Sequence, residues 1–129
     1  PELLTTFATI EDTHIDVRTY MREIMRRGPA ITIVTNGTEG VYVGYQDHVY
    51  FGRAPDVPVV CSVGAGDAFG STFFGYRLCD YSIEDAIRCG LQNSASVIQT
   101  PDTKKGLCTL ADLQDADVTV SVTTHPLSP

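Results

Sequence analysis

The sequence predicts an α/β domain in which helices pack in layers on a sheet. Segments with helical spacing of apolar residues alternate with short β-branched runs, as expected for layered α/β architecture. The apolar content of 43% argues for a packed core rather than a disordered chain. A length of 129 residues suits one domain, and no internal repeat or low-complexity segment divides it.

The first predicted elements are a helix and a buried strand. Residues 15–27 repeat apolar side chains at helical spacing, and two arginines followed by Gly28 form a typical helix end. The apolar positions are Val17, Tyr20, Met21 and Ile24. Residues 30–35 contain the β-branched run Ile31-Thr32-Ile33-Val34, which is typical of a buried strand.

A hairpin and a loop are predicted next. Residues 36–40 form a glycine-punctuated turn, and residues 41–45 and 48–51 then predict two strands joined across Gln46-Asp47. Prolines within residues 55–58 indicate a loop. Val59 and Val60 predict one more short strand, which leads into the turn at Gly64.

Two longer helices follow this turn. One covers residues 65–79, and the other begins after Ser82, where Asp85 three residues later resembles a capping box. On the first helix we expect Phe69, Phe73 and Tyr76 to be buried, and Gly70 and Gly75 to allow close approach. On the second we expect a face of Ile83, Ile87, Leu91, Ser94 and Ile98. A short helix at 109–115 and a strand at 118–122 complete the prediction.

The net charge and the spacing of the cysteines indicate which binding partners and which cellular compartment to expect. Sixteen acidic and nine basic residues give a net charge of −7, which disfavours binding to a nucleic-acid backbone. No apolar run reaches membrane-spanning length, and the N-terminus lacks the order of a secretion signal, so we expect no membrane partner. The cysteines lack zinc-site spacing and are interpreted as reduced, mostly buried thiols of a cytoplasmic protein: Cys61, Cys79, Cys89 and Cys108. The histidines have no partners at metal or triad spacing and are interpreted as surface or turn residues: His14, His48 and His125.

The segment Gly64-Ala65-Gly66-Asp67 carries most of the functional information. A Gly-x-Gly turn that opens a helix exposes backbone N–H groups where the helix dipole favours an anion. A carboxylate in that place, Asp67, is unfavourable beside a phosphate unless it accepts a proton, so the pattern indicates a base beside a phosphoryl group. The alternative is an ordinary strand-to-helix turn with Asp67 in solvent.

A second glycine turn, from Thr35 to Gly40, also follows directly after a predicted strand. In open α/β sheets, ligands collect at the carboxyl ends of the strands, where both turns are expected. The two turns are therefore candidates to flank one nucleotide.

These segments resemble the second half of a ribokinase-like sugar or nucleoside kinase of the PfkB family. The resemblance runs with gaps from about residue 2 to residue 107. Its motifs are Val34-Thr35-Asn36-Gly37-Thr38-Glu39-Gly40, Gly64-Ala65-Gly66-Asp67-Ala68-Phe69, Ser82-Ile83-Glu84-Asp85-Ala86-Ile87 and Asn93-Ser94-Ala95-Ser96. It implies the C-terminal portion of a three-layer α/β fold, with helices packed on a mainly parallel sheet that carries a β-hairpin.

The resemblance also implies a reaction, the transfer of the ATP γ-phosphoryl group to a hydroxyl of a small sugar or nucleoside. Asp67 would be the base, and the N–H groups of Gly64, Ala65 and Gly66 would stabilise the phosphoryl oxygens. Thr35, Gly37 and Gly40 would lie along the phosphates and ribose. Asn93 either borders the adenine or is a polar residue on a helix flank. Glu2 either helps to place Mg²⁺ through water or is a terminal carboxylate.

Two departures from the family pattern leave alternatives open. Cys61-Ser62-Val63 replaces the usual Asp-Thr-x, and a thiol is a poor ligand for a hard cation, which puts potassium activation in doubt. Cys61 is either a packing residue or a reactive thiol. The N-terminal substrate and lid half is absent, so we expect a missing segment or partner chain and no activity from this chain alone. A non-catalytic nucleotide-binding or regulatory module, or a homodimer paired through an unpaired sheet edge, are the alternatives.

Overall fold

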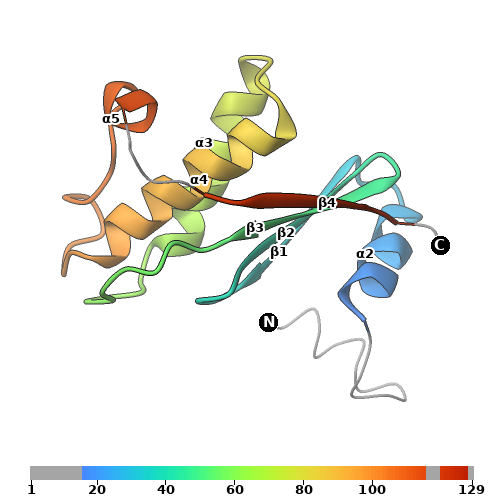
Figure 1. Ribbon diagram of the computed structural model, residues 1–129, viewed down its shortest axis with the longest axis horizontal. Helices are drawn as coiled ribbons and strands as arrows, with labels where there is room; N and C mark the ends of the chain where they lie inside the picture. Colours follow the sequence, from blue (N-terminus) through green and yellow to red (C-terminus); the bar gives the residue numbers. More distant parts are fainter. Residues whose placement is uncertain (1–15, 116–119, 128–129) are drawn as a thin grey trace.

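The described residues form one four-stranded sheet with helices on both of its faces (Figure 1). The computed structural model describes residues 16–115 and 120–127. In chain order the elements are α2 (Val17–Met25), β1 (Ile31–Asn36), β2 (Gly40–Tyr45), β3 (His48–Arg53), α3 (Ala65–Leu78), α4 (Ile83–Ile98), α5 (Leu110–Asp115) and β4 (Val122–Pro126). The predicted α/β class is therefore confirmed.

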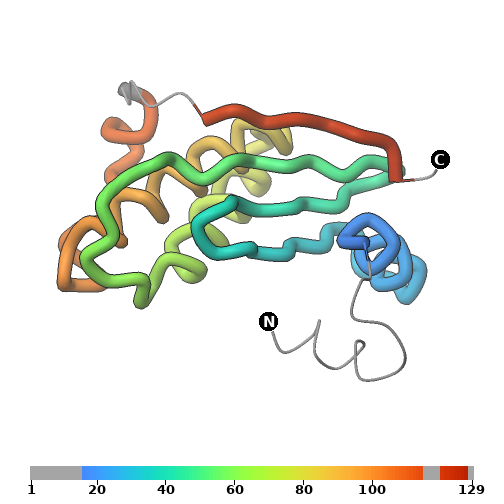
Figure 2. Tube along the Cα trace, turned by 60° about the horizontal axis from the view of Figure 1, so that its bottom comes forward, coloured from blue at the N-terminus to red at the C-terminus, as the bar shows by residue number. Residues whose placement is uncertain are grey.

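The sheet has the order β1-β2-β3-β4, and its three pairings are all antiparallel. The expectation of a mainly parallel sheet is wrong for the described residues, because short turns join β1 to β2 and β2 to β3 and reverse the chain. The predicted hairpin is confirmed, with Tyr45 opposite His48 across Gln46-Asp47. β4 lies along β3 although α3 and α4 separate the two strands in sequence (Figure 2).

The main core lies between the sheet and the pair α3 and α4. Successive residues of a strand point to opposite faces, and Val41 and Val43 of β2 both face this helix pair. They are fully buried with Phe73 and Ile87 from the two helices. Phe69, Phe73 and Tyr76 are all buried, as predicted.

The glycines that permit close helix packing differ from those predicted. A Cβ at Gly70 or Gly75 would meet nothing within 4 Å, so these two glycines do not serve close approach. The close contact is at Gly90 of α4, where an added Cβ would lie 2.8 Å from the ring of Phe69. The three aromatic side chains of α3 determine which face meets α4, and Gly70 and Gly75 lie off that face.

The helix α2 covers part of the opposite face of the sheet. Its buried residues Tyr20 and Met21 pack with Val49 and Leu127. Gly44 of β2 makes room for this contact, because an added Cβ there would lie 3.1 Å from the terminal methyl of Met21. The layers are therefore α2, the sheet, and the pair α3 and α4.

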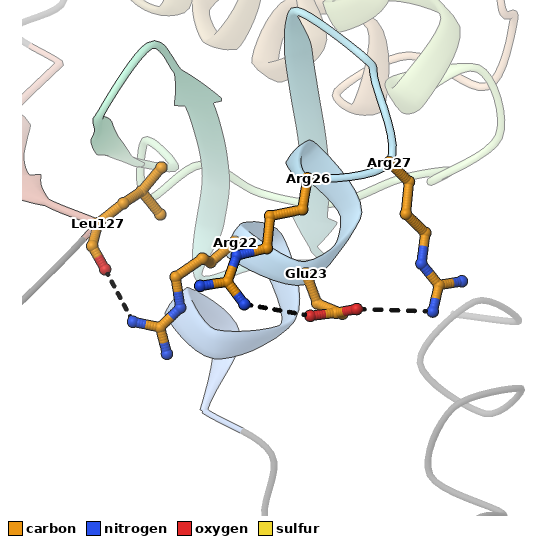
Figure 3. A network of polar contacts seen from close by, with 5 residues as sticks. All are labelled: Arg22, Glu23, Arg26, Arg27 and Leu127. Atoms are coloured by element: carbon orange, nitrogen blue, oxygen red, sulfur yellow. Dashed lines mark hydrogen bonds and ion pairs between the residues drawn. The ribbon is translucent and has the colours of Figure 1, made fainter.

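Figure 3 shows the polar contacts around α2, of which the ion pairs are exposed and the hydrogen bond is part-buried. Glu23 forms ion pairs with Arg26 at 3.8 Å and Arg27 at 3.6 Å, and Arg22 donates to the carbonyl oxygen of Leu127 at 3.4 Å. Exposed ion pairs of this kind contribute little to stability, at most about 1 kcal/mol each. The position of α2 therefore depends mainly on its apolar contacts.

Several local predictions need correction. Val59 and Val60 form no strand and are exposed, but the N–H groups of Val60 and Cys61 both donate to the carbonyl oxygen of Ile98, at 2.7 and 3.1 Å. The last strand begins at Val122 rather than at residue 118, and residues 116–119 lie outside the described part. The four cysteines are free thiols, but Cys79 is exposed and the other three are half-buried, so "mostly buried" was wrong. These cysteines lie in loops or at helix surfaces, where neighbouring segments cover them only in part.

The start of the chain is outside the described residues, and this includes Glu2 and His14. Among the helices of residues 16–115, none combines the length and apolar character needed to cross a membrane.

Candidate functional site

The turn at Gly64 forms the start of α3 and leaves backbone donors unused. Gly64 is the N-cap and has φ +88°, a left-handed conformation that side chains rarely adopt. The N–H of Ala65 donates to the Ser62 carbonyl oxygen at 3.3 Å, and that of Ala68 donates to Gly64 at 2.9 Å. Within the described residues, the N–H groups of Gly66 and Asp67 have no acceptor, as the first turn of a helix requires.

This geometry engages one of the predicted anion donors, Ala65, and adds the N–H of Asp67 to the set. The sequence indicated Gly64, Ala65 and Gly66, but Ala65 already donates within the turn. The reason is that the helix begins at Ala65, so that its orphan donors extend to Asp67. Such a cluster of free N–H groups at a helix N-terminus favours an anion.

Asp67 lies in the first turn of α3 with an exposed side chain. Within the described residues it forms no ion pair, so its carboxylate is not committed to a structural contact. A carboxylate here also interacts favourably with the positive end of the helix dipole. Its predicted role as a base stays a prediction.

A cavity of about 600 Å³ opens beside this turn and is lined by both glycine turns. Thr35, Gly37 and Gly40 contribute from the β1–β2 turn, and Ala65 and Gly66 contribute from the start of α3. A volume of this size lies within the range of small-molecule and cofactor sites. The structure therefore brings the two turns, which are separate in sequence, to one concave site.

The rest of the cavity combines an apolar wall with a few polar groups. Apolar side chains come from Val41, Val57, Val59, Phe69, Leu91 and Ile98. Hydroxyl groups come from Thr35, Thr38, Ser62 and Ser94, and the charged lining residues are Arg53 and Asp56. This distribution suits a ligand that has an apolar part and a polar part.

Sequence reasoning missed Arg53 and Asp56 as lining residues. Arg53 is the last residue of β3 and Asp56 lies in the loop that follows, a stretch that the pattern marked only as the end of a strand and a proline loop. Two opposite charges three residues apart at this proline loop are the signal in the sequence that indicates them.

Asn93 has a structural position on α4. It is buried, its amide donates to the Thr72 hydroxyl at 2.8 Å, and its amide oxygen accepts from the Cys108 N–H at 2.9 Å. It therefore joins α3, α4 and the following loop, and it does not line the cavity. Contact with an adenine stays a prediction without support from the cavity lining.

The segment before the turn is fixed through its backbone. Cys61 is half-buried, and its N–H bond to Ile98 links the approach to Gly64 with the end of α4. Thr103 lies close to Gly64, since an added Cβ at Gly64 would be 3.3 Å from the Thr103 Cβ. The segment before the turn is therefore bonded to the end of α4, and a side chain at Gly64 would crowd Thr103. For Mg²⁺, the described residues contain no cluster of three or more acidic, histidine or cysteine side chains, and Glu2 lies outside them.

Comparison with known proteins shows that the chain is similar to sugar kinases. The chain is 38% identical over 96 residues to acarbose 7(IV)-phosphotransferase of Actinoplanes sp., which covers 70% of this chain and 32% of that protein. It is 32% identical over 116 residues to 1-phosphofructokinase of Haloferax volcanii, covering 88% of this chain and 36% of that protein. The chain thus spans about a third of the length of these relatives.

The fold comparison agrees with this relationship. The structure of Arabidopsis thaliana ribokinase complexed with ribose and ATP matches with a TM-score of 0.67 at 19% identity, covering 73% of this chain and 31% of that one. The model of the family described as "pfkB family carbohydrate kinase" matches residues 2–110, which is most of the chain. The chain therefore belongs to the pfkB family of carbohydrate kinases.

Proposed function

We propose that this chain is the nucleotide-binding and catalytic C-terminal portion of an ATP-dependent kinase that phosphorylates a hydroxyl of a small sugar or nucleoside. The chain spans about a third of its relatives, so the acceptor site and lid would come from residues outside it. We expect no phosphorylation by residues 1–129 alone. The relatives act on different acceptors by name, so the acceptor is left at the level of a small sugar or nucleoside.

The observation that carries the proposal is the shared cavity. A phosphorylated nucleotide needs an apolar surface for its base and unpaired donors for its phosphates. The cavity has an apolar wall, and the N–H groups left free at the start of α3 lie beside it. Gly66 itself lines the cavity, so a phosphate there would meet a free backbone donor.

The roles of the residues follow from the chemistry of phosphoryl transfer, which depends mainly on positioning and electrostatic stabilisation. The free N–H groups around Gly66 would stabilise charge on the transferred group, and Asp67 would accept the proton of the acceptor hydroxyl. Thr35, Gly37 and Gly40 would lie along the phosphates and ribose. Bound Mg²⁺ would neutralise charge on the phosphate oxygens, and Glu2 is the proposed residue near it.

Substitution of Asp67 by Asn in the full-length protein tests the base. We expect turnover to fall by about 10²- to 10⁴-fold, the usual contribution of a general base. ATP affinity should change little, because Asp67 does not line the nucleotide cavity. The measurement is ADP formation with a panel of sugars and nucleosides, together with calorimetric titration of ATP.

Asp80→Asn is the matched control. Asp80 is an exposed aspartate just beyond the other end of α3, and its left-handed backbone, at φ +62°, is one that asparagine tolerates. The same chemical change there should leave turnover within twofold. Near wild-type activity of the Asp67 variant would show that the base lies elsewhere.

A non-catalytic nucleotide-binding module is the alternative, and the unusual Cys61-Ser62-Val63 segment favours it. A binder of this kind would take up ATP but form no ADP with any acceptor. The thiol of Cys61 also puts potassium activation of the kinase in doubt, and replacement of K⁺ by Na⁺ in the ADP assay tests it, because an unchanged rate would show that potassium is not required.

A further inference from the structure

We propose that Arg53 binds the phosphate chain of the nucleotide and supplies the positive side chain of the cavity. This inference rests on the proposed function, because it assigns a residue to the nucleotide of that same site. The supporting features are the position of Arg53 in the sheet, the charge of the cavity lining and the donors that face the same space.

Arg53 is the last residue of β3 and lies directly opposite Gly40 in the β2–β3 pairing. Its N–H donates to the Ser121 carbonyl oxygen at 3.1 Å, and the N–H of Ala54 donates to Glu39 at 3.1 Å. These bonds fix the backbone on both sides of Arg53. The side chain therefore starts from a defined point beside the glycine turn that is proposed to follow the phosphates.

The charges of the residues that line the cavity also support a role for Arg53. Among the described residues that line the cavity, Arg53 is the one basic residue and Asp56 is the one acidic residue. The chain as a whole carries a net charge of −7, so it repels a polyphosphate at long range. Without Arg53 the side chains of the lining would carry a net negative charge, which is unfavourable for an anionic ligand.

The Arg53 guanidinium is also available for a ligand. It is exposed, and within the described residues it forms no ion pair. By contrast, Arg26 and Arg27 pair with Glu23, and Arg88 pairs with Asp85. An unpaired arginine at the edge of a cavity with hydroxyl groups and free backbone donors suits phosphate, because its planar fork matches two phosphate oxygens at once.

Two kinds of donor would then hold the nucleotide from different elements. The N–H groups at the start of α3 would contact one part of the phosphate chain, and Arg53 at the end of β3 would contact another. The apolar wall would hold the base. Removal of the guanidinium should therefore weaken binding of a phosphorylated nucleotide and leave binding of the nucleoside unchanged.

The test is calorimetric titration of ATP and of adenosine into the full-length protein and its variants. Arg53→Gln should weaken ATP binding by about ten- to a hundredfold, the range for hydrogen bonds to charged groups, with adenosine affinity within twofold. Arg53→Lys should restore part of the loss, because it returns the charge without the fork. The control is Arg18→Gln, an exposed arginine on α2 outside the cavity, which should change neither affinity.

Two results would overturn the assignment. Unchanged ATP affinity in Arg53→Gln would show that the guanidinium does not contact the phosphates, and equal loss for ATP and adenosine would show a general distortion of the cavity. If the wild-type protein bound neither ATP nor adenosine, the proposed function would be refuted instead. The two failures are therefore distinguishable.

Discussion

Replacement of Gly90 by Ala should overpack the contact between α3 and α4. A Cβ at Gly90 would lie 2.8 Å from two ring carbons of Phe69 and 3.2 Å from its carbonyl oxygen. Ordinary van der Waals contact begins at 3.4 Å, so the ring must move by about 0.6 Å. The ring has little room to do so, because Phe69 is only 3% exposed and stacks on Phe73 with ring centroids 5.8 Å apart.

The magnitude follows from two opposing effects. Overpacking of a core costs about 1–3 kcal/mol, while replacement of glycine by alanine inside a helix gains about 1 kcal/mol. Gly75→Ala on α3 separates the effects, because a Cβ there meets nothing within 4 Å and only the gain applies. We therefore expect Gly75→Ala to be stabilising, and Gly90→Ala to be less stable than it by about 1–3 kcal/mol.

Equilibrium urea unfolding of the two variants and the wild type measures this difference. Because both substitutions change helix propensity alike, the difference between them reports the overpacking alone. Equal stability of the two variants would refute the close contact at Gly90. Phe69 also lines the cavity, so Gly90→Ala should in addition weaken ATP binding, whereas Gly75→Ala should not.

Three further predictions concern a helix cap, a buried amide and a tyrosine. Ser82 caps α4 through a 3.1 Å bond from a backbone N–H, so its replacement by Ala should cost about 1 kcal/mol in urea unfolding while Ser82→Asp should not. Asn93→Ala should cost about 1–3 kcal/mol, because the Cys108 N–H loses its acceptor and the Thr72 hydroxyl keeps only its bond to the Ala68 carbonyl oxygen; a loss no larger than that of an exposed Asn36→Ala would contradict this. Burial raises the pKa of Tyr76 above its ordinary value. Its contribution to stability is therefore complete below the ordinary tyrosine pKa and is lost as the pH rises above it, since the unfolded chain ionises first. Unfolding followed from neutral to alkaline pH should show this loss in the wild type and a smaller loss in Tyr76→Phe.

The sequence predicted the elements well where the signal was local. The turn between Tyr45 and His48, the cap at Ser82 and the buried aromatic face of α3 depend on neighbouring residues, and all three are confirmed. Val59 and Val60 were misassigned because apolar, β-branched residues favour a strand only where another strand is available to pair with them. Here their segment is bonded to the end of α4 instead.

The candidate site was predicted only in part, for a similar reason. Glycine turns and their neighbours can be read from a short motif, and both turns do line one cavity. The lining by Arg53, Asp56 and the α4 residues depends on how distant segments pack, which no motif contains. Asn93 illustrates the opposite case, a motif residue with a structural position. The motif does not indicate that its amide nitrogen donates to Thr72 or that its amide oxygen accepts from Cys108.

The strand β3 pairs with β4, which comes much later in the sequence, and this order has a consequence for folding. His48–Arg53 lacks the partner strand seen in the described residues until Val122–Pro126 is synthesised, some seventy residues later, after both long helices. Contacts between such distant segments form slowly, and open strand edges are prone to pairing with other chains. A ribosome pause after α4 would therefore expose nascent protein to aggregation at this edge, and chaperone dependence should end when the last strand is released.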